Sequence, residues 1–234
     1  MFAKIRFYWG AFVISFVVAA IMIPMIYIFP EKKGTIMHRL NRVILTLLGA
    51  KLKKEGERDP EADIYMINHQ GIIDIIALEA IENTHFKWVA KKELFDAVWF
   101  GRLLKKGDMI SVDRENKAGL VKLLKDVKKS IESGERAIAI FPEGTRSSGQ
   151  KLLKFKSGPG FIASKLSLKV QPIVVTGSKY LLNEHDKTAH NSTVNISYLP
   201  SFTVDGSDPK WYDRLYDTMQ KKIDEKYEKE GIAR

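Results

Sequence analysis

The chain has 234 residues, enough for one domain with a full core and a small appendage, and its 45% apolar content is that of a globular protein. It contains no cysteine, which excludes disulfide scaffolds, cysteine-ligated zinc and cysteine nucleophiles. The net charge of +10 predicts an affinity for anions, so that nucleic acid, anionic lipid and phosphorylated molecules are candidate partners.

The first predicted element is a helix that contacts a membrane. Residues 7–29 carry no charge, and as a helix they would be about 35 Å long, against about 30 Å for the hydrocarbon core of a bilayer. The run is too long for a cleaved signal peptide, and no small-x-small cleavage site follows it. Its hydrophobicity on all sides argues against a buried core helix of this length. Pro24 predicts a kink or break, because proline removes one helical hydrogen bond.

A second, amphipathic helix is predicted over residues 36–48, with its apolar positions on one face and basic residues elsewhere. It is either an interfacial helix or a helix packed on the body of the protein. The first segment then either spans the bilayer once or, as we favour, forms with the second a two-helix anchor in one leaflet, bent at Pro24. Basic residues between Glu31 and Glu55 outnumber those before the apolar run, which predicts a body on the cytoplasmic face of the cell membrane.

Beyond this N-terminal anchor, which we expect to cover residues 1–55, strands and helices alternate through a body of residues 56–234. Strands are predicted at residues 63–67, 86–90, 109–112, 136–141, 170–175 and 193–199. Helices are predicted at residues 71–81, 93–104, 116–131 and 158–166, with a last one that begins at Asp208 and Pro209. This alternation indicates an α/β fold, a single domain with a mostly parallel mixed sheet flanked by helices.

The first block with chemical potential is residues 68–74 (Asn-His-Gln-Gly-Ile-Ile-Asp), at the end of a predicted strand. Ligand sites of open α/β sheets lie at the carboxyl ends of strands. With His69 in the turn and Asp74 in the first turn of the helix, the carboxylate can hold one imidazole nitrogen and leave the other as a base. The alternative is a locally bonded histidine and a helix-capping aspartate. Four isoleucines surround Asp74 in the sequence, and a carboxylate there needs a partner.

The second block is residues 141–147 (Phe-Pro-Glu-Gly-Thr-Arg-Ser), again after a predicted strand. A glycine permits close backbone approach, and two hydroxyls and an arginine fork suit a phosphate group. The alternative is an ordinary turn with a surface arginine. A third block, residues 105–114, puts basic residues on both sides of a strand, where they are either ligands for an anion or solvated surface residues.

Taken in order, these blocks and residues 170–173 (Val-Gln-Pro-Ile) resemble the four blocks of the glycerolipid acyltransferase family, most closely its bacterial branch that acylates lysophosphatidic acid. The resemblance covers residues 68–177, and the blocks at residues 68–74 and 141–147 match fully. The block at residues 105–114 is looser, with Gly107 and Arg114 in place. An N-terminal membrane anchor is usual for this branch.

The resemblance implies an O-acyltransferase that transfers a fatty acyl group from acyl carrier protein or coenzyme A to the sn-2 hydroxyl of lysophosphatidic acid, giving phosphatidic acid. His69 would be the general base and Asp74 would orient it. Family positions associated with glycerol phosphate, together with Lys105, which we add for its charge, give the expected substrate-binding residues: Lys105, Arg114, Glu143, Gly144, Thr145 and Arg146.

Direct transfer is expected rather than an acyl-enzyme, because the sequence has neither a Gly-x-Ser-x-Gly elbow nor a cysteine. No cofactor is expected. No metal is expected either, since a thioester is already activated and His185 and His190 lie in a polar loop. The alternatives are a related transferase with glycerol-3-phosphate or another lysophospholipid as acceptor, and a non-catalytic adaptor that binds anionic membrane lipid. Nucleic acid is disfavoured, because the basic residues lack interleaved aromatic residues.

Overall fold

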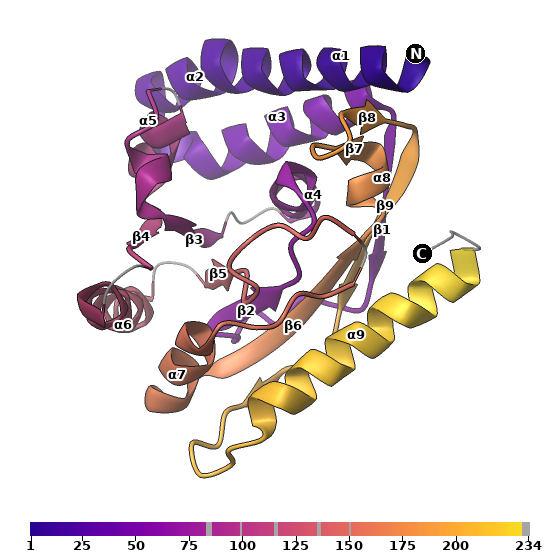
Figure 1. Ribbon diagram of the computed structural model, residues 1–234. Helices are drawn as coiled ribbons and strands as arrows, with labels where there is room; N and C mark the ends of the chain where they lie inside the picture. The colour runs from indigo at the N-terminus through magenta and orange to yellow at the C-terminus, as the bar shows by residue number, and fades with distance from the viewer. Residues whose placement is uncertain (83–85, 99, 115–116, 135–136, 150, 231–234) are drawn as a thin grey trace.

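The computed structural model describes residues 1–82, 86–98, 100–114, 117–134, 137–149 and 151–230. One mixed β-sheet runs through the centre of the molecule, and helices cover both of its faces (Figure 1). The prediction of an α/β fold with a mostly parallel sheet flanked by helices is therefore confirmed. Asn116 and Arg136, the predicted first residues of a helix and a strand, lie outside the described residues.

The sheet has the strand order β1-β9-β6-β2-β5-β3-β4, and β10 pairs with one end of β6. All neighbouring pairs are parallel except β6–β9 and β6–β10, which are antiparallel. A separate short hairpin joins β7 to β8. The strand bounds are β1 Ala50–Glu55, β2 Ile64–Ile67, β3 Lys87–Lys91, β4 Ile110–Val112, β5 Ile138–Ile140, β6 Lys169–Thr176, β7 Leu182–Asn183, β8 Thr188–Ala189, β9 Ser192–Tyr198 and β10 Phe202–Thr203.

The helices pack in two layers, one on each face of the sheet (Figure 1). Alternating side chains of β2 show why: Tyr65 and Ile67 belong to the core on the α1, α3 and α4 face, while Ile64 and Met66 belong to the core on the α6, α7 and α9 face. The helix bounds are α1 Phe2–Phe16, α2 Ile23–Ile28, α3 Lys33–Leu48, α4 Ile72–Ile81, α5 Phe100–Lys106, α6 Lys117–Glu132, α7 Ser157–Lys165, α8 Ser178–Leu181 and α9 Trp211–Glu230.

The N-terminal helix does not break at Pro24. A π-helical segment, Val17–Met22, joins α1 to α2, so that the chain is helical from Phe2 to Ile28. The wider π turn directly precedes the proline, whose ring crowds the preceding turn and which donates no hydrogen bond. The chain reverses instead after Phe29, through a short 3-10 turn over Pro30–Lys32. The bend between the two N-terminal helices was predicted at Pro24, but it lies at this turn.

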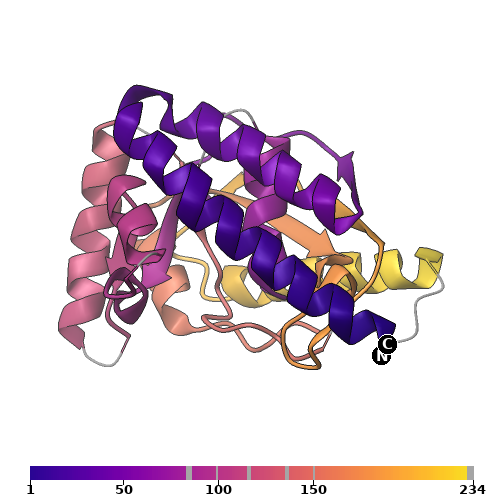
Figure 2. The ribbon, with the colours of Figure 1, turned by 90° about the horizontal axis from the view of Figure 1, so that it is seen from above.

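By length and composition, this N-terminal helix could cross a membrane. Only 28% of its most apolar stretch of 18 residues is buried. Seen from above, it lies across the top of the molecule with α3 beside it (Figure 2). Large apolar side chains on its outer side are exposed, as are two on α3: Phe2, Ile5, Tyr8, Trp9, Phe12, Phe16, Tyr27, Ile28, Val43 and Leu47.

The inner sides of these helices are part of the main core. Val13 of α1 and Ile44 and Leu48 of α3 belong to the same buried cluster as β2 and α4. Of the two alternatives for the second helix, packing on the body is therefore the one that the structure shows. Residues 50–55, which the sequence analysis placed in the anchor, form β1 and pair in parallel with β9. That assignment was wrong because a lysine-rich edge strand lacks the apolar alternation by which strands are recognised.

Two further boundaries differ from the prediction. The helix expected over residues 93–104 is divided into a 3-10 turn, Lys92–Phe95, and α5, because the chain folds back closely there: a Cβ atom at Gly101 would lie 2.2 Å from the Phe95 carbonyl oxygen. The last helix begins at Trp211, since the Asp208 carboxylate caps a preceding turn by accepting the backbone N–H of Lys210 at 3.0 Å.

Candidate active site

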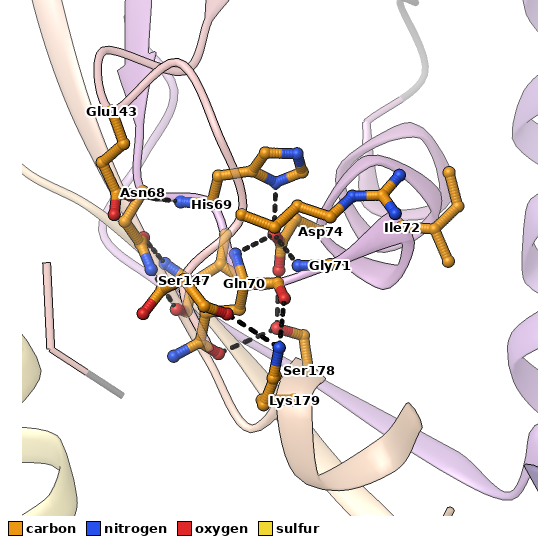
Figure 3. Close-up of polar contacts among 12 residues, drawn as sticks. Asn68, His69, Gln70, Gly71, Ile72, Asp74, Glu143, Ser147, Ser178 and Lys179 are labelled. Carbon is orange, nitrogen blue, oxygen red and sulfur yellow. Dashed lines mark hydrogen bonds and ion pairs between the residues drawn. The ribbon is translucent and has the colours of Figure 1, made fainter. Parts of the chain in front are cut away.

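The candidate site lies where three neighbouring parallel strands end. β2 leads into residues 68–71, β5 into residues 141–147, and β6 into Gly177 and α8. Because the carboxyl ends of parallel strands meet at one edge of a sheet, these segments converge, as Figure 3 shows. The backbone N–H of Ser147 donates to the carbonyl of His69 at 2.9 Å, which ties the first segment to the second.

His69 and Asp74 lie in direct contact. The Nδ1 atom of His69 is 2.9 Å from Oδ2 of Asp74, and the aspartate is fully buried (Figure 3). Asp74 is the third residue of α4, and its Oδ2 also accepts the backbone N–H groups of Gln70 and Gly71 at 2.6 and 2.9 Å. Within the part of the chain that the structure describes, no hydrogen bond is made to Nε2 of His69. This nitrogen is free to exchange a proton with a bound molecule.

An aromatic stack holds the imidazole plane. The ring of His69 lies on that of Phe141 with centroids 3.7 Å apart and an interplanar angle of 12°, and Trp88 also stacks on Phe141, with centroids 5.2 Å apart. The indole N–H of Trp88 donates to Oε1 of the buried Glu79 at 2.7 Å, which fixes the far end of the stack. The histidine therefore has both its ring plane and its Nδ1 atom constrained.

Glu143 was predicted to bind substrate, but its carboxylate is occupied by the backbone. Oε1 accepts the N–H of His69 at 2.6 Å, Oε2 accepts the N–H of Leu153 at 2.7 Å, and the residue is 1% exposed. Burial raises the pKa of the Glu143 carboxyl to about 7, although the two backbone hydrogen bonds oppose the rise. In this geometry Glu143 joins the two segments of the site and positions His69.

The rest of the second segment carries the exposed groups. Gly144 has a φ of +70°, a left-handed turn that favours glycine, and its carbonyl accepts a hydrogen bond from Arg114. Thr145 is exposed beside it. Arg146 forms an ion pair with Glu184, whose other carboxylate oxygen accepts the N–H of Ile72 at 3.0 Å. Arg146 is thus brought, through Glu184, to the start of α4.

Lys105 is not joined to this group by any contact among the described residues. It is exposed in the last turn of α5, a helix that lies against α2 (Figure 1). Its assignment to the site stays a prediction. Among the described residues there is no group of three or more histidine, aspartate or glutamate side chains that could hold a metal ion.

Several residues of the site were not predicted. The Asn68 side chain pins its segment to β6, with its amide donating to the carbonyl of Val175 at 2.8 Å and accepting that residue's N–H at 2.7 Å. Ser178 and Lys179 follow β6, and Lys179 is buried, with Nζ 2.7 Å from the Ser147 carbonyl oxygen. Polar residues directly after a predicted strand were the available signal for this pair. Glu184 lies in the β7–β8 hairpin, which no pattern in the sequence predicts.

Comparison with known proteins shows to which family the chain belongs. A family model described as acyltransferase matches residues 51–176, more than half of the chain. The chain is 41% identical over 177 residues to the 1-acyl-sn-glycerol-3-phosphate acyltransferase of Helicobacter pylori, with 75% of this chain and 74% of that protein covered. The enzyme of the same name from Escherichia coli is 30% identical over 180 residues, with 75% and 71% covered.

The chain therefore belongs to the acyltransferase family, and the predicted membership is confirmed. It is an O-acyltransferase of the kind that its bacterial relatives represent. The crystal structure of the 1-acyl-sn-glycerophosphate (LPA) acyltransferase PlsC from Thermotoga maritima has the same fold, with a TM-score of 0.73 at 19% identity and coverage of 96% of this chain and 94% of that one.

Proposed function

We propose that this protein transfers a fatty acyl group from an acyl thioester, of acyl carrier protein or coenzyme A, to the sn-2 hydroxyl of 1-acyl-sn-glycerol-3-phosphate, giving phosphatidic acid. The observation that carries the proposal is the His69–Asp74 pair: Nδ1 is tied to a buried carboxylate, and Nε2 is left to act on a substrate. Relatives from two bacteria, 41% and 30% identical, carry the name of this activity.

His69 acts as the general base and then as the general acid. Nε2 takes the proton of the acceptor hydroxyl as its oxygen attacks the thioester carbonyl. When the tetrahedral intermediate collapses, the carbon–sulfur bond breaks and the imidazolium returns the proton to the thiolate sulfur. Asp74 contacts Nδ1 at 2.9 Å and stabilises the imidazolium that forms. No covalent acyl-enzyme is needed, because the thioester is already activated.

The phosphate of the acceptor binds at the rim of the site. Arg146 supplies a guanidinium fork that suits phosphate, and it exchanges its Glu184 partner for the ligand. Thr145 contributes an exposed hydroxyl, and Arg114, which bonds the Gly144 carbonyl, supports the loop and adds positive charge. Lys105 completes the proposed binding residues for phosphate or for the acyl donor, while Glu143 acts through the backbone of His69.

The N-terminal helices hold the enzyme at the membrane in which its acceptor and product reside. The exposed aromatic and aliphatic side chains of α1, α2 and α3 suit a lipid environment. The helical segment that ends at Leu48 is the proposed anchor, and the rest of the chain is the acyltransferase domain on the cytoplasmic face. The basic surface attracts anionic lipid at about 1 kcal/mol per suitably placed lysine or arginine.

The test is acyl transfer by purified protein in detergent. Wild type is incubated with lysophosphatidic acid and a labelled acyl thioester, in parallel with glycerol-3-phosphate and other lysophospholipids as acceptors. His69→Ala removes the base, and His185→Ala is the matched control, since His185 is exposed and its Nδ1 contacts the neighbouring Asp186 carboxylate at 2.9 Å. We expect phosphatidic acid from wild type and the control, and a loss of at least about 100-fold in His69→Ala.

Each other outcome changes a different part of the proposal. No product with any donor and acceptor removes the acyltransferase reaction and favours a lipid-binding adaptor. Faster acylation of another acceptor keeps the chemistry and replaces the substrate. Product that persists in His69→Ala keeps the enzyme and removes the general-base mechanism.

A further inference from the structure

The Asp74 carboxylate has two differently occupied oxygens. Oδ2 receives three donors, from the His69 ring and from the backbone of Gln70 and Gly71. Oδ1 has one partner among the described residues, the hydroxyl of Ser178 at 2.5 Å. The Ser178 bond acts on the opposite oxygen from these three donors, and so it contributes to the rotation of the carboxylate about its Cβ–Cγ bond and to the direction from Oδ2 to the imidazole.

Ser178 is held in place by the backbone. It is the first residue of α8 and follows Gly177, which has a φ of +82°. A Cβ atom at Gly177 would lie 2.2 Å from the carbonyl oxygen of Thr193 in β9, so that a side chain there would displace the turn. The hydroxyl therefore reaches Asp74 from a fixed point at the end of β6, as Figure 3 shows.

Gln70 connects this serine to the C-terminal helix. One end of its side-chain amide, Oε1, is 2.9 Å from Oγ of Ser178, and the other, Nε2, is 3.1 Å from the hydroxyl of Tyr227 in α9. A serine has one hydroxyl proton, and the charged Asp74 oxygen is its stronger acceptor. We therefore turn the Gln70 amide so that its nitrogen faces Ser178. Ser178 then donates to Asp74, the Gln70 nitrogen donates to the Ser178 oxygen, and the Tyr227 hydroxyl donates to the Gln70 oxygen.

These contacts are buried, and they cross from one layer of the molecule to the other. Tyr227, Gln70 and Ser178 are 4%, 2% and 1% exposed. Tyr227 belongs to the core on the α9 face of the sheet, whereas α4, which carries Asp74, packs on the opposite face. The contacts pass around the carboxyl edge of the sheet, where the site lies.

We propose that Tyr227, Gln70 and Ser178 form a positioning relay through which α9 orients Asp74 and so aims Nε2 of His69 at the acceptor hydroxyl. The inference rests on the proposed function, since it gives these residues a role in that reaction. None of the three touches substrate. Because the relay fixes a direction rather than a binding contact, its loss lowers the rate of the chemical step and leaves substrate affinity in place.

The test separates the relay from a general effect on packing. Tyr227→Phe removes only the hydroxyl, and Tyr216→Phe is the matched control: it lies on the same helix, and its hydroxyl donates to the Leu152 carbonyl at 3.2 Å. Ser178→Ala breaks the relay next to Asp74, and the double variant Tyr227→Phe/Ser178→Ala measures coupling. Kinetics with lysophosphatidic acid and acyl thioester are combined with thermal unfolding of each variant.

We expect Tyr227→Phe to lower kcat about 3- to 10-fold and Ser178→Ala at least as much, with both KM values within about 2-fold of wild type. The double variant is expected to be no slower than Ser178→Ala alone, since either change interrupts the same relay. Tyr216→Phe keeps the wild-type kcat. Separately, the Nδ1–H proton resonance of His69 is expected to shift in Tyr227→Phe and not in Tyr216→Phe.

A Tyr227→Phe enzyme with the kcat of wild type overturns the relay and leaves the proposed function intact. The same conclusion follows if the fold-loss of kcat in the double variant equals the product of the two single fold-losses. If the unfolding temperature of Ser178→Ala falls below the assay temperature, the Tyr227→Phe kinetics and the His69 resonance decide alone. Wild type that forms no phosphatidic acid fails at the earlier step, the proposed function itself.

Discussion

Substitution of Glu143 by glutamine tests whether this carboxyl is a positioning group or a ligand for substrate. Burial raises its pKa from the ordinary value of 4.5 to about 7. A group whose pKa is raised on folding stabilises the fold below its unfolded pKa, and this contribution is lost as the pH rises through the folded pKa. For Glu143 the loss amounts to about 3 kcal/mol in all, and about 2–3 kcal/mol of it falls between pH 5 and pH 8.

Glutamine cannot ionise, so Glu143→Gln lacks this pH dependence. The stability of wild type relative to the variant is therefore expected to fall by about 2–3 kcal/mol between pH 5 and pH 8. For a chain of this size that is a change of about 5–10 °C in the difference between the two unfolding temperatures. The assay is thermal unfolding in detergent at intervals of half a pH unit, with Glu132→Gln, at an exposed position on α6, as the control.

A second readout comes from kinetics at one pH. A positioning role predicts a lower kcat for Glu143→Gln with an unchanged KM for lysophosphatidic acid, because the side chain contacts the backbone of His69 rather than the acceptor. A difference in unfolding temperature that stays constant from pH 5 to pH 8, combined with a raised KM, would refute the reasoning. It would return Glu143 to the substrate-binding role implied by its family position.

Three more changes have defined outcomes. Glu184→Gln frees Arg146 from its ion pair, so the KM for lysophosphatidic acid should fall about 3-fold in steady-state assays; a raised KM would mean that the pair prepares the arginine for phosphate. Phe141→Leu removes the ring stacked on His69 and should lower kcat about 10-fold with unchanged KM; an unchanged kcat contradicts a role for the stack. Gly177→Ala puts a Cβ atom 2.2 Å from a carbonyl oxygen of β9 and should cost about 2 kcal/mol or more in thermal unfolding; an unfolding temperature equal to that of wild type argues against a fixed turn.

The parts of the fold that were predicted well are those with strong periodicity. The buried strand β2 and the apolar α4 follow one another without ambiguity, and this order places His69 in the turn and Asp74 in the first turn of the helix. Their contact at 2.9 Å follows from that local geometry. The strand β1 was missed for the opposite reason, since its lysine-rich sequence has little apolar alternation and its partner β9 lies far along the sequence.

The candidate site divides in the same way. The motifs indicate which residues lie near the edge of the sheet, and the structure brings residues 68–74 and 141–147 together there. A motif does not indicate which way a side chain points, and so Glu143 was expected to face substrate although it faces the backbone. Glu184 reaches Ile72 from a hairpin more than a hundred residues away, a contact that only tertiary structure determines.

The pairing of β1 with β9 has a consequence for how the protein is made. Residues 50–55 leave the ribosome directly after the two N-terminal helices, but their partners, residues 192–197, are about 140 residues further along. The N-terminal helices are therefore synthesised long before this edge of the sheet can form, and β1 has no β9 to pair with during that interval. Because α1 and α3 also contribute to the main core, the body completes its folding only when the first and the last parts of the sheet have both been made.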